Sequence, residues 1–229
     1  MPWDQWIRTV EIEPSIYAAD FANLGEQLDV LMRTGARIFH FDVGDGHFVP
    51  PITMGPIVLQ SIAPRVHESG GVLDCHLMVE RPDRHFAAIA AAGGDSVTFH
   101  YEAVFDVAGT IRAARQHELQ VGIAFNPETE PETVATLAGG VDLVLCMSIH
   151  PGFSGQEFMP GAIDRIRRLR SALGPQIHLQ VDGGIAIDNI RSVYDAGADL
   201  FVCGSAIFGM EDLPPSYRRL VQQLNVHGL

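Results

Sequence analysis

Short apolar runs rich in valine, isoleucine, leucine and phenylalanine alternate with amphipathic or alanine-rich stretches along the whole chain. The apolar runs have the length and composition of strands, and they predict strands at residues 10–16, 37–42, 72–79, 95–99, 120–125, 141–147, 177–182 and 199–203. Between them the pattern predicts helices that include residues 21–34, 82–92, 106–117, 131–138 and 161–173. Several of these stretches end at a glycine, which commonly terminates a helix.

This alternation favours one α/β fold. Strands separated by helices imply right-handed crossovers and a parallel sheet. Eight such units without a low-complexity linker predict a single closed (β/α)8 TIM barrel over residues 1–229, with residues 211–229 as a terminal helix and tail. An open doubly wound sheet is the alternative, but no G-x-G-x-x-G motif follows the first predicted strand. A barrel places its chemistry at the carboxyl ends of its strands.

Polar residues stand near those strand ends. His40 and Asp42 share one face of the second predicted strand, because side chains alternate along a strand. His76 lies near the end of the third strand and Asp182 at the end of the seventh. Each alone is more often structural, but an unpaired polar cluster inside a barrel would be costly. Two imidazoles and two carboxylates converging in the barrel mouth instead suit a divalent ion such as zinc, manganese, iron(II) or cobalt.

Other polar residues near these strands receive different interpretations. Asp45 is expected to form a turn, and Asp74 is expected to support the cluster from behind. Four further histidines are interpreted as lying outside the chemistry: His47, His85, His117 and His178.

Glycine-rich loops follow the sixth, seventh and eighth predicted strands. They contain Gly152 and Gly155, then Gly183-Gly184, then Gly204 before Ser205. Backbone amides in such loops bind phosphate in many barrels, helped by the amino terminus of a short helix. One glycine pair would indicate no more than a turn, but three successive loops favour a phosphate ligand.

The composition narrows the chemistry. All 15 basic residues are arginine, and the absence of lysine excludes a Schiff-base aldolase, a pyridoxal-phosphate enzyme and a Walker-type phosphate loop. A net charge of −13 argues against a duplex nucleic-acid surface, so a phosphate would be held by local dipoles or a metal. The three cysteines lie in apolar runs and are expected to be buried and reduced. No leader or membrane-spanning run is evident, so a soluble, cytoplasmic protein is expected, without nucleic-acid or membrane partners.

Several motifs resemble the ribulose-phosphate 3-epimerase family. They are the stretch from Pro14 to Leu24, residues 40–50, residues 74–79, the 147–156 loop, residues 181–184 and residues 204–209. Together the motifs span about residues 12–209 in the order of the family. The resemblance implies a ribulose-phosphate-binding TIM barrel that carries one divalent metal ion (zinc, iron(II), manganese or cobalt). It further implies an isomerase of carbohydrate metabolism, in the pentose phosphate pathway, that converts D-ribulose 5-phosphate to D-xylulose 5-phosphate.

The resemblance also assigns roles to residues. It places the metal on His40, Asp42, His76 and Asp182, and the two catalytic acid/base carboxylates on Asp42 and Asp182. It places substrate contacts on Ser15, His76, Met78, Met147, Gly152, Phe153, Ser154, Gly155, Gly183, Gly184, Gly204 and Ser205. Two carboxylates on opposite sides of a planar 2,3-enediolate can invert C3, while the metal holds the developing charge. We expect Asp42 to take the proton from the ribulose epimer and Asp182 to return one.

The sequence departs from the usual family motifs at a few positions. Gly44 stands at a usual methionine, and the other departures are Pro51, Ser154, His150 and the pair Tyr17-Ala18. The volume freed at Gly44 leaves open another ketose phosphate, such as allulose 6-phosphate or a shorter sugar. A sugar-phosphate lyase of the same superfamily and a non-enzymatic sensor are less favoured, the first for want of a lysine and the second because a binder needs no paired bases. A homo-oligomer, dimer or hexamer, is expected from the family.

Overall fold

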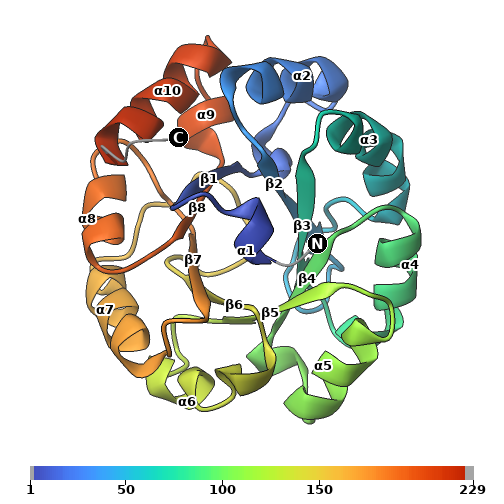
Figure 1. Ribbon diagram of the computed structural model, residues 1–229, viewed down its shortest axis with the longest axis vertical. Helices are drawn as coiled ribbons and strands as arrows, with labels where there is room; N and C mark the ends of the chain where they lie inside the picture. Colours follow the sequence, from blue (N-terminus) through green and yellow to red (C-terminus); the bar gives the residue numbers. More distant parts are fainter. Residues whose placement is uncertain (1–2, 225–229) are drawn as a thin grey trace.

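The computed structural model describes residues 3–224, in which eight parallel strands form one barrel (Figure 1). The strands are β1 (Glu11–Pro14), β2 (Ile38–Gly44), β3 (Val72–Met78), β4 (Ser96–His100), β5 (Gln120–Phe125), β6 (Leu143–Met147), β7 (His178–Asp182) and β8 (Leu200–Cys203). Hydrogen bonding runs in the order β1-β8-β7-β6-β5-β4-β3-β2. A parallel bridge between Ser15 and His40 joins the end of β1 to β2 and closes the ring. The predicted barrel is therefore confirmed.

Helices surround the barrel. The α-helices are α1 (Trp3–Trp6), α2 (Leu24–Thr34), α3 (Pro56–Glu68), α4 (Phe86–Ala91), α5 (Val107–Arg115), α6 (Pro131–Ala135), α7 (Ala162–Ala172), α8 (Ile190–Asp195), α9 (Ser205–Phe208) and α10 (Leu213–Leu224). Short 3-10 helices are η1 (Ile16–Ala18), η2 (Pro82–Arg84), η3 (Tyr101–Ala103) and η4 (Ala138–Gly140). The expected terminal helix corresponds to α10, and the expected tail after it, residues 225–229, lies outside the described residues.

The predicted boundaries differ from the observed ones where the chain changes its hydrogen bonding. The stretch 82–92 is divided into η2 and α4, and 131–138 into α6 and η4. Asp106 lies before α5, where its carboxylate accepts a hydrogen bond from the Gly109 amide at 2.8 Å and caps the helix. The strand predicted to end at residue 99 continues to His100. This last residue of the strand contacts His76 at the barrel mouth.

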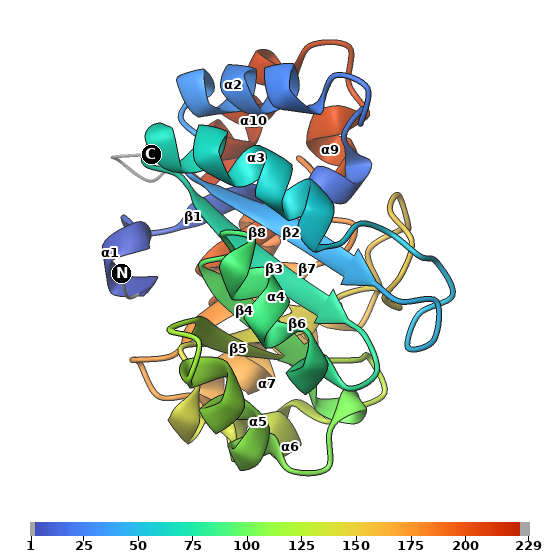
Figure 2. The same ribbon diagram turned by 90° about the vertical axis from the view of Figure 1, so that its right-hand side faces the viewer.

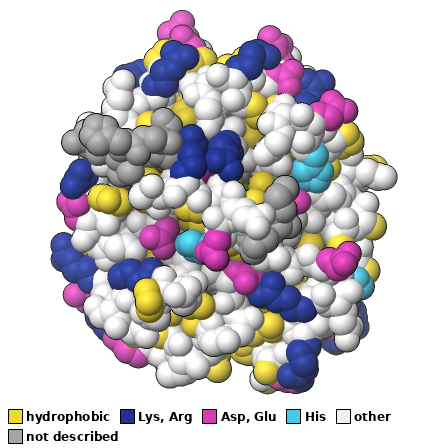
Figure 3. All heavy atoms as spheres, in the orientation of Figure 1, with side chains coloured by type: hydrophobic (Ala, Val, Ile, Leu, Met, Phe, Trp, Pro, Cys, Tyr) yellow, Lys and Arg dark blue, Asp and Glu magenta, His cyan; other side chains and the backbone are white. Residues whose placement is uncertain are grey.

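The amino-terminal end of the barrel is closed by apolar packing. Trp3 and Trp6 of α1 are buried and contact each other edge to face, with ring centroids 4.8 Å apart. They belong to one cluster with residues such as Ile38 and Leu143 at the starts of strands. Figure 2 shows α1 on one side of the barrel and the arrowheads of β2 and β3 on the other. Arginine and acidic side chains are interspersed on the α1 face (Figure 3).

All three cysteines lie in the buried apolar core. Cys75, Cys146 and Cys203 are buried and form no disulfide, as predicted. Burial raises the pKa of Cys146 to about 11 and that of Cys75 well above its usual value.

Within residues 3–224, no helix is both long and apolar enough to cross a membrane.

One pair of substitutions tests which face of α3 packs on the barrel. Leu59 is fully buried and Ile57, on the same helix, is 81% exposed. Leu59→Ala should lower the free energy of unfolding by about 2–5 kcal/mol, because it removes buried apolar surface and leaves a cavity. Ile57→Ala should stay within about 0.5 kcal/mol of the parent chain. Urea denaturation measures both, and equal effects would contradict the described packing.

Candidate metal and catalytic site

The polar side chains predicted from the strand ends meet at the carboxyl-terminal mouth of the barrel. His40 and Asp42 come from β2, His76 from β3 and Asp182 from β7, and one donor atom of each lies within 4.8 Å of all the others. The register of β2 and β3 places Asp42 beside His76. Nδ1 of His76 lies 3.1 Å from Oδ1 of Asp42 and 3.8 Å from Oδ2 of Asp182.

The cluster fits a divalent cation. Nε2 of His40 lies 3.3 Å from Oδ1 of Asp42, yet this buried nitrogen has no hydrogen-bond partner among the described residues. Its other nitrogen, Nδ1, is 3.1 Å from the Asp74 carboxylate, so in the neutral ring the proton belongs on Nδ1 and Nε2 offers a lone pair to the cluster. An imidazole lone pair beside two carboxylates and a second imidazole is a donor set typical of first-row divalent ions.

A buried polar layer supports His40 from behind. Asp74 accepts hydrogen bonds from Ser96 Oγ at 2.6 Å and from Gln180 Nε2 at 2.8 Å, as well as contacting His40. Gln180 also donates to Glu13 at 2.6 Å. The geometry agrees with the supporting position expected for Asp74. Sequence reasoning missed Glu13, although it lies two residues before Ser15, which continues the line of β1 and bridges to His40.

Burial and neighbouring charges give the carboxyl groups of the cluster different pKa values. Burial favours the neutral forms of both Asp42 and His40, but their mutual attraction outweighs it, so the pKa of Asp42 is held well below its usual range and that of His40 is raised well above its usual value. A cation bound at Nε2 would take the place of the second proton of the His40 ring. Burial and then the negative charge of Asp42 raise the pKa of Asp182 to about 7. Burial likewise raises the pKa of Glu13 to about 7, against the hydrogen bond with His40.

A third histidine reaches the cluster and was missed by sequence reasoning. His100 is fully buried at the end of β4, and its Nε2 lies 2.8 Å from Nε2 of His76. The Phe48 ring packs on it with centroids 4.7 Å apart. Burial lowers the pKa of His100 to about 4. The alternation of Ser96, Thr98 and His100 could have revealed it, had the predicted strand been extended by one residue.

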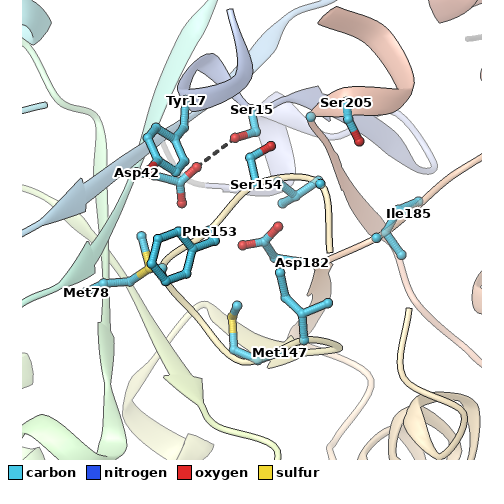
Figure 4. Close-up of a pocket in the computed structure, with 17 residues that line it drawn as sticks. Ser15, Tyr17, Asp42, Met78, Met147, Phe153, Ser154, Asp182, Ile185 and Ser205 are labelled. Atoms are coloured by element: carbon cyan, nitrogen blue, oxygen red, sulfur yellow. Dashed lines mark hydrogen bonds between the residues drawn. The ribbon is translucent and has the colours of Figure 1, made fainter. Parts of the chain in front are cut away.

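A pocket opens above the cluster. Asp42 and Asp182 line it, and Figure 4 shows their carboxylates turned toward the same space from two sides. The predicted substrate contacts Ser15, Met78, Met147, Gly152, Phe153, Ser154, Gly155, Gly183, Gly184, Gly204 and Ser205 line it too. His40 and His76 are fully buried and do not belong to the lining. The lining also includes Tyr17, Ile149, Ile185 and Val202, which sequence reasoning did not place in the site.

The loop from β6 to α7 packs tightly on the glycines after β7. Ser148 Oγ donates to the carbonyl oxygens of Asp182 and Gly183 at 2.9 and 2.7 Å. Gly184 has φ +63°, and a Cβ built there would lie 2.6 Å from the Phe158 amide nitrogen. Glycine is required at this position by both the backbone angle and the close approach, which places the two loops on one pocket wall.

The structure corrects the expectation of an enlarged space at Gly44. A Cβ at this position would lie 2.9 Å from the Pro51 carbonyl oxygen and 3.0 Å from Cγ2 of Val49. The Gly44 amide donates to Thr53 Oγ1 at 2.7 Å, which holds the 45–53 segment against the strand end. Gly44 is not among the residues that line the pocket. The volume of the missing side chain is therefore filled by the chain's own loop.

The fold and the site together define a class: a (β/α)8 barrel with a candidate divalent-metal cluster and glycine-rich loops at its carboxyl-terminal mouth. The sequence model described as "Ribulose-phosphate 3 epimerase family" matches residues 11–208. The chain belongs to the ribulose-phosphate 3-epimerase family.

Curated relatives match over most of their length. Ribulose-phosphate 3-epimerase of Serratia marcescens is 41% identical over 211 residues, covering 91% of this chain and 98% of the relative. Ribulose-phosphate 3-epimerase of Escherichia coli K12 is 40% identical over 216 residues, covering 93% of each chain. Among solved structures, 3-hexulose-6-phosphate synthase from Salmonella typhimurium superposes with a TM-score of 0.73 at 19% identity, covering 94% of this chain and 98% of that chain. At that identity the likeness shows the fold alone.

The packing at Gly44 generates a prediction. Gly44→Ala should lower the free energy of unfolding by about 1–3 kcal/mol, because the new methyl group displaces the 45–53 segment. The matched control is Gly174→Ala, since a Cβ at Gly174 meets no heavy atom within 4 Å. Thermal and urea unfolding of both variants would check this. A Gly44→Ala variant as stable as the control would show that the space is open after all.

Proposed function

We propose that this protein epimerises a ketose phosphate at C3 and that D-ribulose 5-phosphate is its substrate, converted to D-xylulose 5-phosphate. The observation that carries the proposal is the pair of carboxylates, Asp42 and Asp182, turned into one pocket beside the histidine cluster. Membership of the ribulose-phosphate 3-epimerase family supports the choice of reaction. Inversion of a carbon next to a carbonyl needs a base on one face and an acid on the other.

The two carboxylates divide this work. Ser15 Oγ donates to Oδ2 of Asp42 at 2.7 Å, which fixes the orientation of the carboxylate while it faces the pocket. Asp42 takes the C3 proton of the ribulose epimer, and Asp182 delivers a proton to the opposite face. In the reverse direction Asp182 is the base and Asp42 the acid. Met78, Met147 and Phe153 line the same pocket and present apolar side chains that exclude water from the reacting carbon.

The proposed cofactor is one divalent ion, zinc, iron(II), manganese or cobalt. His40 through Nε2, His76 through Nδ1, Asp42 and Asp182 would hold it. When bound, a divalent cation supplies positive charge beside the oxygens on C2 and C3 and stabilises the charge that develops there. The buried Nε2 of His40, which has no hydrogen-bond partner among the described residues, is the observation in favour of this assignment.

The phosphate group is proposed to lie against the glycine loops. Gly183, Gly184, Gly204 and Ser205 come from the ends of β7 and β8 and line the pocket. No arginine is among the described residues that line the pocket, and the chain has no lysine. Backbone amides are therefore the donors that hold the phosphate.

The filled space at Gly44 removes the structural reason for a larger or shorter sugar. The absence of lysine continues to disfavour a lyase.

We further propose that the whole chain acts as one barrel domain, in the cytoplasm, and as a homo-oligomer, either a dimer or a hexamer. Ile52, Ile57 and Phe105 are largely exposed apolar side chains that supply surface for such an assembly.

Deuterium incorporation in D2O distinguishes the two bases. Asp182→Asn should lose at least about 100-fold in kcat for epimerisation, because a proton-transfer group is removed. It should still exchange the C3 hydrogen of D-ribulose 5-phosphate with solvent, since Asp42 remains. Asp42→Asn should instead exchange only the C3 hydrogen of D-xylulose 5-phosphate. Mass spectrometry and proton NMR of the recovered sugars measure both reactions.

The control for these variants is Asp164→Asn, a substitution in the first turn of α7, away from the pocket. Metal content is measured for every variant, because both catalytic candidates are also proposed ligands. If the two variants show the reverse pattern of deuterium exchange, Asp182 is the base for the ribulose epimer and Asp42 the base for the xylulose epimer. Full epimerase activity in either variant would contradict the two-base proposal.

Removal of the cation gives an independent prediction. Dialysis against a chelator should abolish epimerisation, and about one equivalent of Co2+, Mn2+ or Zn2+ per chain should restore it. His40→Ala should no longer retain the ion, because it loses the Nε2 donor. His117→Ala, at an exposed histidine, should retain it. Elemental analysis of protein purified without chelator shows whether a metal ion is bound and which one. Undiminished activity after complete metal removal would refute the proposed cofactor.

A further inference from the structure

The two histidines of the proposed cation site differ in what lies behind them. His40 turns its far nitrogen, Nδ1, to the carboxylate of Asp74 at 3.1 Å. His76 turns its far nitrogen, Nε2, to another histidine, His100, at 2.8 Å. Both imidazole rings of this second pair are fully buried, and they stack with an interplanar angle of 24°. A histidine behind a ligand can either donate or accept a hydrogen bond. The surroundings of His100 must therefore decide which of the two rings donates in the hydrogen bond between His76 and His100.

The facing nitrogens of His76 and His100 must share one hydrogen. Two neutral imidazoles at 2.8 Å form a hydrogen bond only if one Nε2 donates and the other accepts. If His76 donates, its Nδ1 presents a lone pair toward Asp42 and Asp182, and because Oδ1 of Asp42 lies only 3.1 Å away, this arrangement requires a cation between them. If His100 donates, the proton of His76 lies on Nδ1, where it blocks ligation.

The far side of His100 selects between these directions. Nδ1 of His100 lies 3.4 Å from Oε2 of Glu102. Nδ1 of His100 and Oδ1 of Asn126 are both buried and have no well-formed hydrogen bond among the described residues. An ionised carboxylate has no hydrogen to donate. A bare Nδ1 on His100 would therefore set a lone pair against acceptor oxygens, whereas a protonated Nδ1 donates to them.

Glu102 is itself fixed as an acceptor. Its Oε1 accepts hydrogen bonds from the Asn126 amide at 2.8 Å and from the Thr129 hydroxyl. Arg165 holds the same loop by donating to the carbonyl oxygens of Thr129 and Asn126, each at 3.0 Å. These hydrogen bonds hold the loop after β5 in place and, through it, hold the Glu102 carboxylate that faces His100.

We propose that His100 is a positioning residue that holds His76 as its Nε2–H tautomer, so that Nδ1 of His76 is presented to the cation. The direction of donation runs from His76 to His100 and from His100 to Glu102 and Asn126. The inference rests on the cation site of the proposed function, but not on the reaction or the sugar. The Phe48 ring, whose centroid lies 4.7 Å from that of His100, covers the pair and limits its motion.

Three variants separate positioning from simple packing. His100→Leu removes the acceptor, His100→Gln retains an amide oxygen that can accept from His76, and Thr98→Val is the control. Thr98 lies two residues earlier on the same face of β4, and its buried hydroxyl has no hydrogen-bond partner among the described residues. Valine has nearly the shape of threonine, so the control tests burial on this strand without touching the histidine pair.

The readout is the affinity for Co2+, measured by visible absorption and by competition with a chelator. His100→Leu should weaken Co2+ binding by about 10–100-fold, the usual cost of losing the partner behind a ligand. His100→Gln should recover most of that loss, and Thr98→Val should match the parent chain. Parent-like affinity in His100→Leu would overturn the proposal, as would an equal loss in His100→Gln and His100→Leu.

A second measurement needs no variant. The imidazole nitrogen-15 spectrum of the Zn2+-loaded parent protein reports which nitrogens of His76 and His100 carry a proton. We expect the proton on Nε2 of His76 and on Nδ1 of His100, and the opposite pair of tautomers would overturn the proposal even if His100→Leu fails to fold. Failure of the parent protein to bind Co2+ or Zn2+ would refute the proposed cation site, whereas cation binding with the opposite tautomer of His100 would refute only the role of His100.

Discussion

Carboxylates and imidazoles lie out of contact with water in the carboxyl-terminal half of this barrel, and each must find a partner there. Isolated charge in such an environment is costly, whereas paired and hydrogen-bonded charge is tolerated. Asp42 and Asp74 satisfy this requirement through serine hydroxyls and histidines. His40 Nε2 is left without a partner among the described residues, and it faces the other donors of the cluster. The need to compensate buried charge thus explains the supporting layer and makes the cluster a candidate cation site.

The same constraint divides the barrel along its axis. Tryptophans of α1 and apolar residues at the strand starts fill the amino-terminal end, where no chemistry is needed. The pocket opens at the opposite, carboxyl-terminal end of the strands, the end at which Figure 2 shows the arrowheads of β2 and β3. The chain contains no lysine, and no arginine is among the described residues that line the pocket. Backbone amides of the glycine-rich lining, together with the proposed cation, would therefore supply positive potential at the mouth.

Much of the site could be predicted because strand alternation is a local property. His40 and Asp42 are two residues apart and must share a face, and parallel strands bring their carboxyl ends together. Glu13 and His100 were missed for different reasons. Glu13 is a charged residue in a short strand, and its burial depends on Gln180, a residue 167 positions away. His100 occupies the last position of β4, and strand boundaries are the least reliable part of a pattern-based prediction.

By itself the sequence determined the order of strands and helices, the barrel they form and the four residues that meet at its mouth. These follow from periodicity and from the geometry of parallel strands, which are insensitive to details of side-chain packing. The tertiary structure decided how those residues are supported and what space surrounds them. The substitution at Gly44 suggested a larger cavity, but the 45–53 segment fills it. Loop packing and the direction of a hydrogen bond between buried histidines depend on contacts between distant segments, which no local pattern records.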